Sequence, residues 1–493
     1  MEPWKKNPVV YEINTWVWLW ELSREMGYPV TLGNIPDEKW DELSNLSIEA
    51  IWLMGVWERS PKGIDISNHH AGNLADFRSA LPDFSFEDNV GSPYCVRRYL
   101  VDEQLGGNQG LAIARNQLAQ RGIKLILDFV PNHLACDHPW VTAFPEYFIC
   151  GNKEDLRDDP NSFVMIDGAI FACGKDPYYP AWQDVLQLNA FYPELREAAI
   201  ETVTKISGQC DGVRCDMAML LMNGVFERTW GKRAGARPTF EFWEELIPAV
   251  KRSNHDFIFI AEAYWDLEWK LQQQGFDFCY DKRLYDRLEH ESAHSINQHL
   301  MAEPEYQSKL IRFIENHDEL RHVVAFQQGK NRAAVVISST LPGAKLYHEG
   351  QFEGRKVKLP VFLRRRPDEP ADTALFGFVK RLLNAIHHPV FKTGTWQLCT
   401  STGWSDNDSF QNLLSWCWYD DDDRYLIVVN YSAQPAQGRI RMPANDLLRS
   451  INWRLNDTLS DVNFERNGEE LNDEGLYVAL GPWQNHFLRF YPM

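Results

Sequence analysis

Residues 124–133 read KLILDFVPNH, a short apolar run that closes on polar side chains. A compact run of this kind between turn residues is typical of a buried strand. Polar residues at the carboxyl end of such a strand lie at the edge where parallel α/β sheets bind their ligands. The stretch therefore predicts one strand of a parallel sheet, with Asp128, Asn132 and His133 at its functional edge.

The same pattern recurs through the first 350 residues, and each run is followed by a longer segment with helical periodicity. Alternation of this kind indicates βα units around a parallel sheet, and eight of them close a (β/α)8 barrel. The expected strands are VVYEINTWVWL from Val9, IEAIWLMGVW from Ile48, KLILDFV from Lys124, GVRCDM from Gly212, FIFIAEA from Phe257, FDFCY from Phe276, KLIRFIE from Lys309 and AKLYHEG from Ala344.

Two further regions depart from this rhythm. After the third expected strand, residues 134–186 are rich in Asp, Pro, Gly and Tyr and too long for one helix, which predicts a small inserted domain. From residue 393 to 493 the pattern becomes all-β, in LLSWCWYD, RYLIVVNYS, QGRIRMP and LYVALGPWQNHFLRFY, which predicts a C-terminal β-sandwich. The α/β barrel itself is expected from residues 1–133 and 187–392.

Composition narrows the classes of function. The 69 acidic and 50 basic residues give a net charge of −19, which disfavours nucleic acid and anionic membrane surfaces as partners. No apolar stretch has the length of a membrane span. The nine cysteines contain no CxxC pair and the start lacks a leader pattern, so we expect reduced thiols and a cytoplasmic protein. The 19 Trp and 18 Tyr are suited to covering sugar faces.

Charged and polar residues interrupt five of the expected strands at their carboxyl ends. Barrel enzymes build their sites there, so these residues are expected to converge on one cleft. Glycoside cleavage needs such a set: a nucleophilic carboxylate, a carboxylic acid with a raised pKa and polar groups around the sugar. The residues are Asp128, Asn132 and His133; Arg214 and Asp216; Glu262; His317 and Asp318; and His348 and Glu349.

Four of these segments resemble, in order, the motifs of the α-amylase family of glycoside hydrolases. They are LDFVPNH, GVRCDMAML, FIAEAYW and FIENHD, and the resemblance covers nearly the whole chain. It implies that Asp216 is the nucleophile of a retaining mechanism and that Glu262 is the general acid and base. It also implies that Asp318 stabilises the distorted sugar ring.

The resemblance implies a substrate-binding set as well. Arg214, two residues before the nucleophile, is expected to lower the pKa of Asp216. His133 and His317 are expected to hydrogen-bond sugar hydroxyls, together with Asp128. In GSPYCVRRYLVDEQLGG, Tyr94 is expected to stack on the sugar in the cleavage subsite.

Two departures from the family pattern concern the cofactor and the acceptor side. Leu220 stands where the second motif often has histidine, and of the usual calcium pattern Asn132 alone remains. Since calcium prefers six to eight oxygen ligands, we predict no metal and no other cofactor. The ending of the eighth expected strand, AKLYHEGQFEGRK, points to an unusual acceptor side.

The preferred interpretation is hydrolysis of a small α-glucoside or short malto-oligosaccharide, because water needs no acceptor site and the inserted domain is short. Transfer to a sugar, or phosphorolysis, is the alternative, since GSPY is reminiscent of sucrose phosphorylase-like relatives. Two remote alternatives are a non-catalytic partner protein of the same family and a zinc protease. The latter rests on an HExxH pattern, His290, Glu291 and His294. The oligomeric state stays open.

Overall fold

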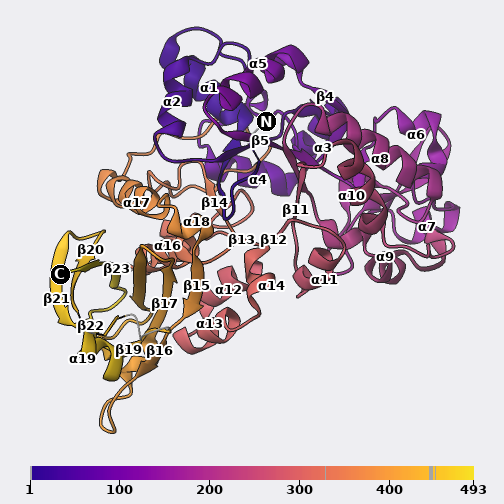
Figure 1. Cartoon of the computed structure of the whole chain (residues 1–493). Helices are drawn as coiled ribbons and strands as arrows, with labels where there is room; N and C mark the ends of the chain where they lie inside the picture. Colours follow the sequence, from indigo (N-terminus) through magenta and orange to yellow (C-terminus); the bar gives the residue numbers. More distant parts are fainter. Residues whose placement is uncertain (1–2, 328, 444–447, 450) are drawn as a thin grey trace. The chain divides into compact units, whose positions relative to one another are not determined.

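The computed structural model describes residues 3–327, 329–443, 448–449 and 451–493. Eight parallel strands close into a barrel in the order β1-β14-β13-β12-β11-β10-β5-β2, so the predicted barrel is confirmed (Figure 1). The strands are β1 (Val9–Asn14), β2 (Ala50–Met54), β5 (Lys124–Phe129), β10 (Gly212–Cys215), β11 (Ile258–Ala261), β12 (Phe278–Tyr280), β13 (Leu310–Arg312) and β14 (Ala344–His348).

The chain divides into two compact units, each described here by itself. The first consists chiefly of Val10–Tyr280 and Val357–Asp368, and the second of Asp281–Lys356 and Glu369–Met493. The first unit carries β2, β5, β10, β11, β12 and all but the first residue of β1, whereas β13 and β14 belong to the second.

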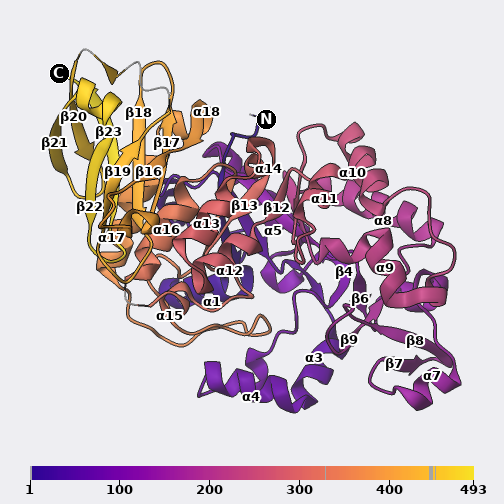
Figure 2. The same cartoon turned by 90° about the horizontal axis from the view of Figure 1, so that it is seen from below.

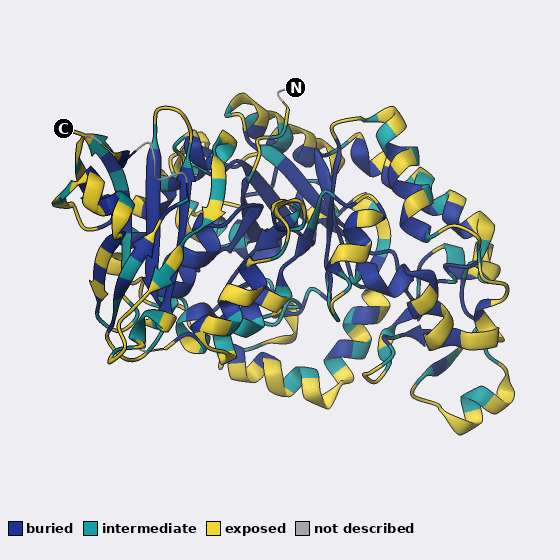
Figure 3. Ribbon diagram, turned by 60° about the horizontal axis from the view of Figure 1, so that its bottom comes forward, coloured by how far each residue is buried: buried dark blue, intermediate teal, exposed yellow. Residues whose placement is uncertain are grey.

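The barrel strands form where apolar side chains are buried on both faces. Strand β5 is buried at every position after Lys124, and β2, β10 and β11 are buried throughout, as the dark blue ribbons of Figure 3 show. Strands covered on both faces read as continuous apolar runs, which is why the sequence locates them well.

The first expected strand was wrong in its second half. Strand β1 ends at Asn14, and TWVWL, expected from the sequence to be strand, begins helix α1 (Thr15–Met26). Asn14 is the N-cap residue, and its side chain accepts a hydrogen bond from the Val17 amide at 3.5 Å. An apolar run does not by itself distinguish strand from helix, and here the cap decides between them.

Helices follow the barrel strands and cover the sheet. The longer ones are α5 (Gly107–Gln120), α8 (Pro193–Ser207), α10 (Phe242–Ser253), α12 (Lys282–His290), α16 (Lys330–Thr340) and α17 (Thr373–Ile386). Two more, α3 (Pro61–His69) and α4 (Ala71–Ala80), follow one another in the first unit, separated by His70, and α3 packs against strand β9 of the inserted domain (Figure 2).

The segment predicted as an inserted domain contains an antiparallel sheet with the strand order β6-β9-β8-β7. Its strands are β6 (His133–Ala135), β7 (Phe163–Ile166), β8 (Ala169–Gly174) and β9 (Trp182–Gln187). The sheet thus extends one residue beyond residues 134–186 at each end. Because β6 starts at His133, the motif LDFVPNH at the end of the third expected strand runs directly into the insert.

The C-terminal region forms two antiparallel sheets that share one apolar core, as the predicted sandwich requires. One sheet has the order β15-β17-β18-β23-β20-β21 and the other β16-β19-β22. The strands are β15 (Thr395–Leu398), β16 (Thr400–Thr402), β17 (Leu413–Tyr419), β18 (Arg424–Asn430), β19 (Ala436–Arg441), β20 (Asn452–Asp457), β21 (Val462–Asn467), β22 (Leu476–Leu480) and β23 (Asn485–Pro492).

All nine cysteines are free thiols; seven are buried, Cys399 is half-buried and Cys150 alone is exposed. Among the described residues, no helix combines the length and the hydropathy that a bilayer crossing requires.

Candidate active site

The two carboxyls expected to perform catalysis follow directly on neighbouring barrel strands. Asp216 comes after the last residue of β10 and Glu262 after the last residue of β11, and the register pairs Cys215 with Ala261. The Glu262 amide donates to the Cys215 carbonyl at 3.1 Å, which continues the ladder by one residue. Equal strand ends therefore place the two side chains next to one another.

One guanidinium joins the two carboxyls. Arg214 Nη1 lies 2.8 Å from Asp216 Oδ1, and Arg214 Nη2 lies 2.8 Å from Glu262 Oε2. All three side chains are buried. Buried carboxylates are costly without a partner, and here a single positive charge serves two of them. The two carboxyls and the guanidinium thus form one small polar cluster among the apolar barrel strands.

The remaining oxygens of the pair are not equivalent. Glu262 Oε2 also accepts from the Met217 amide at 2.6 Å, which is possible because Met217 has a left-handed backbone, φ 44°. Glu262 Oε1 accepts only from the Tyr264 hydroxyl, at 2.8 Å. Among the described residues of the first unit, Asp216 Oδ2 accepts no hydrogen bond. Each carboxyl thus has one oxygen bound to Arg214, while its second oxygen makes no contact with that guanidinium among the described residues.

The predicted effect of Arg214 on the pKa of Asp216 is present but outweighed. Burial raises the pKa of Asp216 to about 8; Arg214 lowers it, and the neighbouring Glu262 raises it. Desolvation favours the neutral acid, and two adjacent carboxyls resist ionising together. Asp216 therefore retains a proton near neutral pH, beside the carboxyl of Glu262.

Arg214 is itself held by aromatic rings. Its guanidinium carbon lies 5.3 Å from the ring centre of Trp52, 5.1 Å from that of Tyr94 and 5.8 Å from that of Tyr280. Tyr94 is half-buried. Its ring thus lies over the cation that binds both carboxyls, which is compatible with the expected stacking role.

Asp128 lies next to Arg214, and its side chain is 1% exposed. Its Oδ2 accepts from Trp52 Nε1 at 3.2 Å and from the Gly55 amide at 3.3 Å, and its Oδ1 is 3.6 Å from Arg214 Nη1. In this arrangement the Asp128 carboxyl forms an ion pair with Arg214. Its predicted contact with substrate stays a prediction.

His133 begins β6 and is neutral, because burial lowers its pKa to about 4. Its Nδ1 lies 3.2 Å from Asn132 Nδ2, and its ring centre lies 5.1 Å from that of Trp182. Because Nδ1 accepts from the Asn132 amide, the neutral ring carries its proton on Nε2, which is a hydrogen-bond donor.

Asn132, the one residue that remains of the calcium pattern, accepts hydrogen bonds from Gln187. Gln187 Nε2 donates to the Asn132 carbonyl and to Asn132 Oδ1, both at 2.9 Å. An amide N–H group thus faces the oxygen that a cation would need, and neither residue carries charge. Calcium is bound by carboxylates and several oxygens, so this donor set does not fit it.

The second unit carries His317 and Asp318. His317 is buried, and its Nε2 lies 3.0 Å from Asp318 Oδ2, whereas the Asp318 side chain is 44% exposed. Asn316 Oδ1 accepts from the amides of Asp318 and Glu319 at 2.9 and 3.0 Å, an Asx turn that fixes the backbone at Asp318.

A buried ionic network supports this loop, and the sequence did not reveal it. Glu315 forms ion pairs with Arg321 and with His322, whose Nδ1 lies 2.9 Å away, and His348 Nδ1 lies 3.3 Å from it. Burial alone would raise the pKa of Glu315, but the charge of Arg321 and hydrogen bonds from His322 and His348 hold it well below its usual range. The sequence offered one sign of this network, because Glu315 is a charged residue at the end of an apolar run.

Two other residues singled out in the sequence have structural positions. Leu220 is buried in the turn Ala218–Leu221 that follows Asp216. In the HExxH pattern, His290 ends helix α12 whereas His294 lies in helix α13 (Ala293–Leu300). A zinc pair of this kind needs both histidines on one continuous helix, so the protease alternative fails at the break between the helices.

A family model described as Alpha amylase, catalytic domain, matches residues 36–357. The chain is 23% identical over 448 residues to Alpha-amylase MalA of Haloarcula japonica, covering 88% of this chain and 56% of that protein. It is 21% identical to an alpha-1,4-glucan:maltose-1-phosphate maltosyltransferase of Picrophilus torridus, covering 90% and 66%. The chain thus spans little more than half the length of the first relative.

Among solved structures, the maltogenic alpha-amylase AmyB of Thermotoga neapolitana has the same fold. The two superpose with a TM-score of 0.69 at 19% identity, over 98% of each chain.

Proposed function

This chain belongs to the α-amylase family, and we propose that it is a retaining glycoside hydrolase acting on a small α-glucoside or a short malto-oligosaccharide. The observation that carries the proposal is the pair Asp216 and Glu262 on the two nitrogens of one buried guanidinium. Retaining enzymes place their two carboxyls close together, with no room for water between them, and a shared guanidinium is suited to that spacing.

The two oxygens that do not contact Arg214 define the chemistry. Asp216 gives up its proton and its Oδ2 attacks the anomeric carbon to form a glycosyl ester, while a proton passes through Glu262 Oε1 to the leaving oxygen. Glu262, now ionised, then takes a proton from water, and the water oxygen displaces Asp216 from the sugar. Met217 N–H and Arg214 keep Oε2 fixed during both steps, so Oε1 alone exchanges the proton.

The remaining predicted residues would bind the sugar. Tyr94 offers a ring face over Arg214, and neutral His133 offers the N–H donor of its Nε2. We propose that His317 and Asp318, held by the Asx turn at Asn316, bind the hydroxyls of the reacting ring.

Transfer to a second sugar is the alternative. It is favoured by the likeness to the alpha-1,4-glucan:maltose-1-phosphate maltosyltransferase of Picrophilus torridus. The same two carboxyls serve both reactions, because an acceptor hydroxyl can replace water in the second step.

A product-resolved assay tests the proposal. Aryl α-glucosides and malto-oligosaccharides are incubated with wild type and Asp216→Asn, with and without phosphate. We expect glucose or short sugars from wild type and a loss of about 10³-fold or more in the variant. Longer sugars would indicate transfer and glucose 1-phosphate would indicate phosphorolysis. Equal turnover by Asp216→Asn and wild type would refute the assignment.

A further inference from the structure

Two residues of the loop that follows Glu262 have an unusual backbone. Trp265 has a φ of 64° and Asp266 a φ of 59°, in the left-handed region that residues with a side chain rarely adopt. Such conformations persist where surrounding contacts hold them, and they cluster at functional sites. The contacts of this loop therefore bear on Glu262, the residue from which it starts.

One side chain of the loop contacts the reacting end of Glu262. The Tyr264 hydroxyl donates to Glu262 Oε1 at 2.8 Å, whereas Oε2 is held by Arg214 and by the Met217 amide. A protonated carboxyl oxygen can accept one hydrogen bond while it donates another. Tyr264 can therefore fix the direction of the acid while Oε1 gives its proton to a leaving oxygen.

A ring contact joins the same loop to the inserted domain. Trp265 lies against Tyr178, with ring centres 4.9 Å apart and ring planes at 79°. This edge-to-face arrangement is a favoured geometry for aromatic pairs. Tyr178 belongs to the segment between β8 and β9, and 61% of it remains exposed. The contact thus connects the insert with the neighbour of Tyr264.

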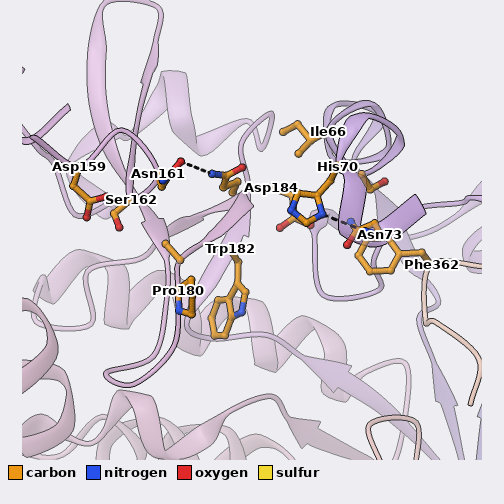
Figure 4. Close-up of a pocket in the computed structure, with 13 residues that line it drawn as sticks. Ile66, His70, Asn73, Asp159, Asn161, Ser162, Pro180, Trp182, Asp184 and Phe362 are labelled. Atoms are coloured by element: carbon orange, nitrogen blue, oxygen red, sulfur yellow. Dashed lines mark hydrogen bonds between the residues drawn. The ribbon is translucent and has the colours of Figure 1, made fainter. Parts of the chain in front are cut away.

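The segment that carries Tyr178 is anchored on both sides of it. The buried Asp176 accepts from the amides of Tyr178 at 2.6 Å and Tyr179 at 2.9 Å, an Asx turn. Further along the chain, Trp182 lines a cavity of the first unit (Figure 4) and packs on His133, with ring centres 5.1 Å apart. The insert therefore presents the Tyr178 ring from a fixed position.

We propose that Tyr178, through Trp265, holds the Tyr264 hydroxyl on Glu262, so that the inserted domain positions the general acid. Tyr178 and Trp265 are positioning residues, because they act on the acid through Tyr264. The proposal rests on the proposed function and deepens it, since the insert then determines how well the acid protonates a leaving group.

The test uses two substrates with the same aglycone ring and a different need for an acid. Phenyl α-glucoside has a poor leaving group, whereas a dinitrophenyl α-glucoside reacts with little acid help. We expect Tyr178→Ala to lower kcat/KM about tenfold on the phenyl glucoside and less than about twofold on the dinitrophenyl glucoside. Tyr178→Phe, which keeps the ring, should restore the rate.

Tyr179→Ala is the matched control. Tyr179 is the next residue of the same segment, is 70% exposed, and has no ring contact among the described residues. This variant should stay within about twofold of wild type on both substrates. Equal rates in Tyr178→Ala and Tyr179→Ala would overturn the proposal. Equal losses on the two glucosides would also overturn it, because they would indicate a ring that binds the aglycone.

A double-mutant cycle tests whether Tyr178 acts through Tyr264. Tyr264→Phe removes the hydroxyl, so kcat/KM on the phenyl glucoside should fall about tenfold or more. Adding Tyr178→Ala to that variant should change the rate by less than about twofold, because the hydroxyl that it holds is already gone. Losses that multiply would show independent roles and would count against the proposal.

Hydrogen exchange separates this proposal from the proposed function, since it needs no turnover. The amides of Leu267 and Leu271 report on the loop, because they donate to the Tyr264 and Leu267 carbonyls at 3.3 and 3.0 Å. Their exchange should be about tenfold faster in Tyr178→Ala and unchanged in Tyr179→Ala. That result supports the contact even if wild type cleaves nothing, whereas unchanged exchange in both variants overturns it.

Discussion

At the scale of single residues, Arg214 determines the properties of the site. Its charge is divided between Asp216 and Glu262, and three aromatic rings surround it. A carboxyl nucleophile paired with a guanidinium that contacts no other carboxyl would have a low pKa. Shared with a second carboxyl and buried, Asp216 instead has a pKa of about 8, so the pair stores the proton that the leaving group needs.

This proton predicts an alkaline limb in the pH profile. As the pH rises through about 8 the last proton leaves the pair, and kcat/KM on unactivated glucosides should fall about tenfold per pH unit. Glu262→Gln should slow unactivated glucosides far more than activated aryl glucosides, which need little acid help. In that variant the activated substrate should show no alkaline limb, because only the nucleophile titrates.

Steady-state rates between pH 5 and 10 on both substrates check this. An alkaline limb of normal size in Glu262→Gln would contradict this role of the proton. Asn316→Ala is unsuitable as a control here, since Asn316 fixes the backbone of Asp318.

Residues differ in how far the sequence could locate them. Asp216 and Glu262 could be located because each directly follows a buried run, and parallel strands end at one edge. Glu315 could not, because its partners Arg321, His322 and His348 are assembled by the fold. For Asp128 the polar position was visible, but its burial under Arg214 depends on Trp52 from another strand.

At the scale of elements, the junction between β5 and the inserted sheet depends on Gln187. This residue ends β9, is fully buried, and donates to Asn132 and to the Leu188 carbonyl at 3.0 Å. The sequence analysis predicted an insert over residues 134–186 but not its sheet, although Asp167 and Gly168 between two apolar runs are typical of the hairpin that β7 and β8 form. Capping at Asn14 likewise overrode an apolar run that resembled a strand.

Gln187→Ala should loosen this junction locally. Loss of the buried amide leaves Asn132 groups without partners, a cost of about 1–3 kcal/mol, or roughly a ten- to hundredfold increase in local opening. Hydrogen exchange of the amides in β6 and β9 measures it. The control is Gln120→Ala, an exposed position at the end of α5, which should leave exchange in these strands unchanged. Equal exchange in both variants would show that Gln187 does not hold the insert.

At the scale of the whole molecule, the residues present suit a protein that needs no bound metal. Asn132 is satisfied by an amide donor, and no set of three or more His, Cys, Asp or Glu suited to a metal occurs among the described residues. We propose that stability and activity are independent of divalent ions.

Dialysis against EDTA should therefore shift the melting temperature by less than about 1 °C, because a chelator destabilises only a fold that binds a metal. Calcium or zinc added back should have no effect on activity. A drop of several degrees that calcium reverses would show a site that the pairing of Asn132 with Gln187 does not account for.

The distribution of thiols has a practical consequence for following this molecule in solution. Cys150 is the single exposed cysteine, and it lies in the insert. Its backbone forms an isolated antiparallel β-bridge with Phe171 of β8. A maleimide dye should therefore label the natural chain at one dominant position, without removal of the other eight cysteines. The emission of that dye would report, in real time, how the insert responds when an oligosaccharide arrives.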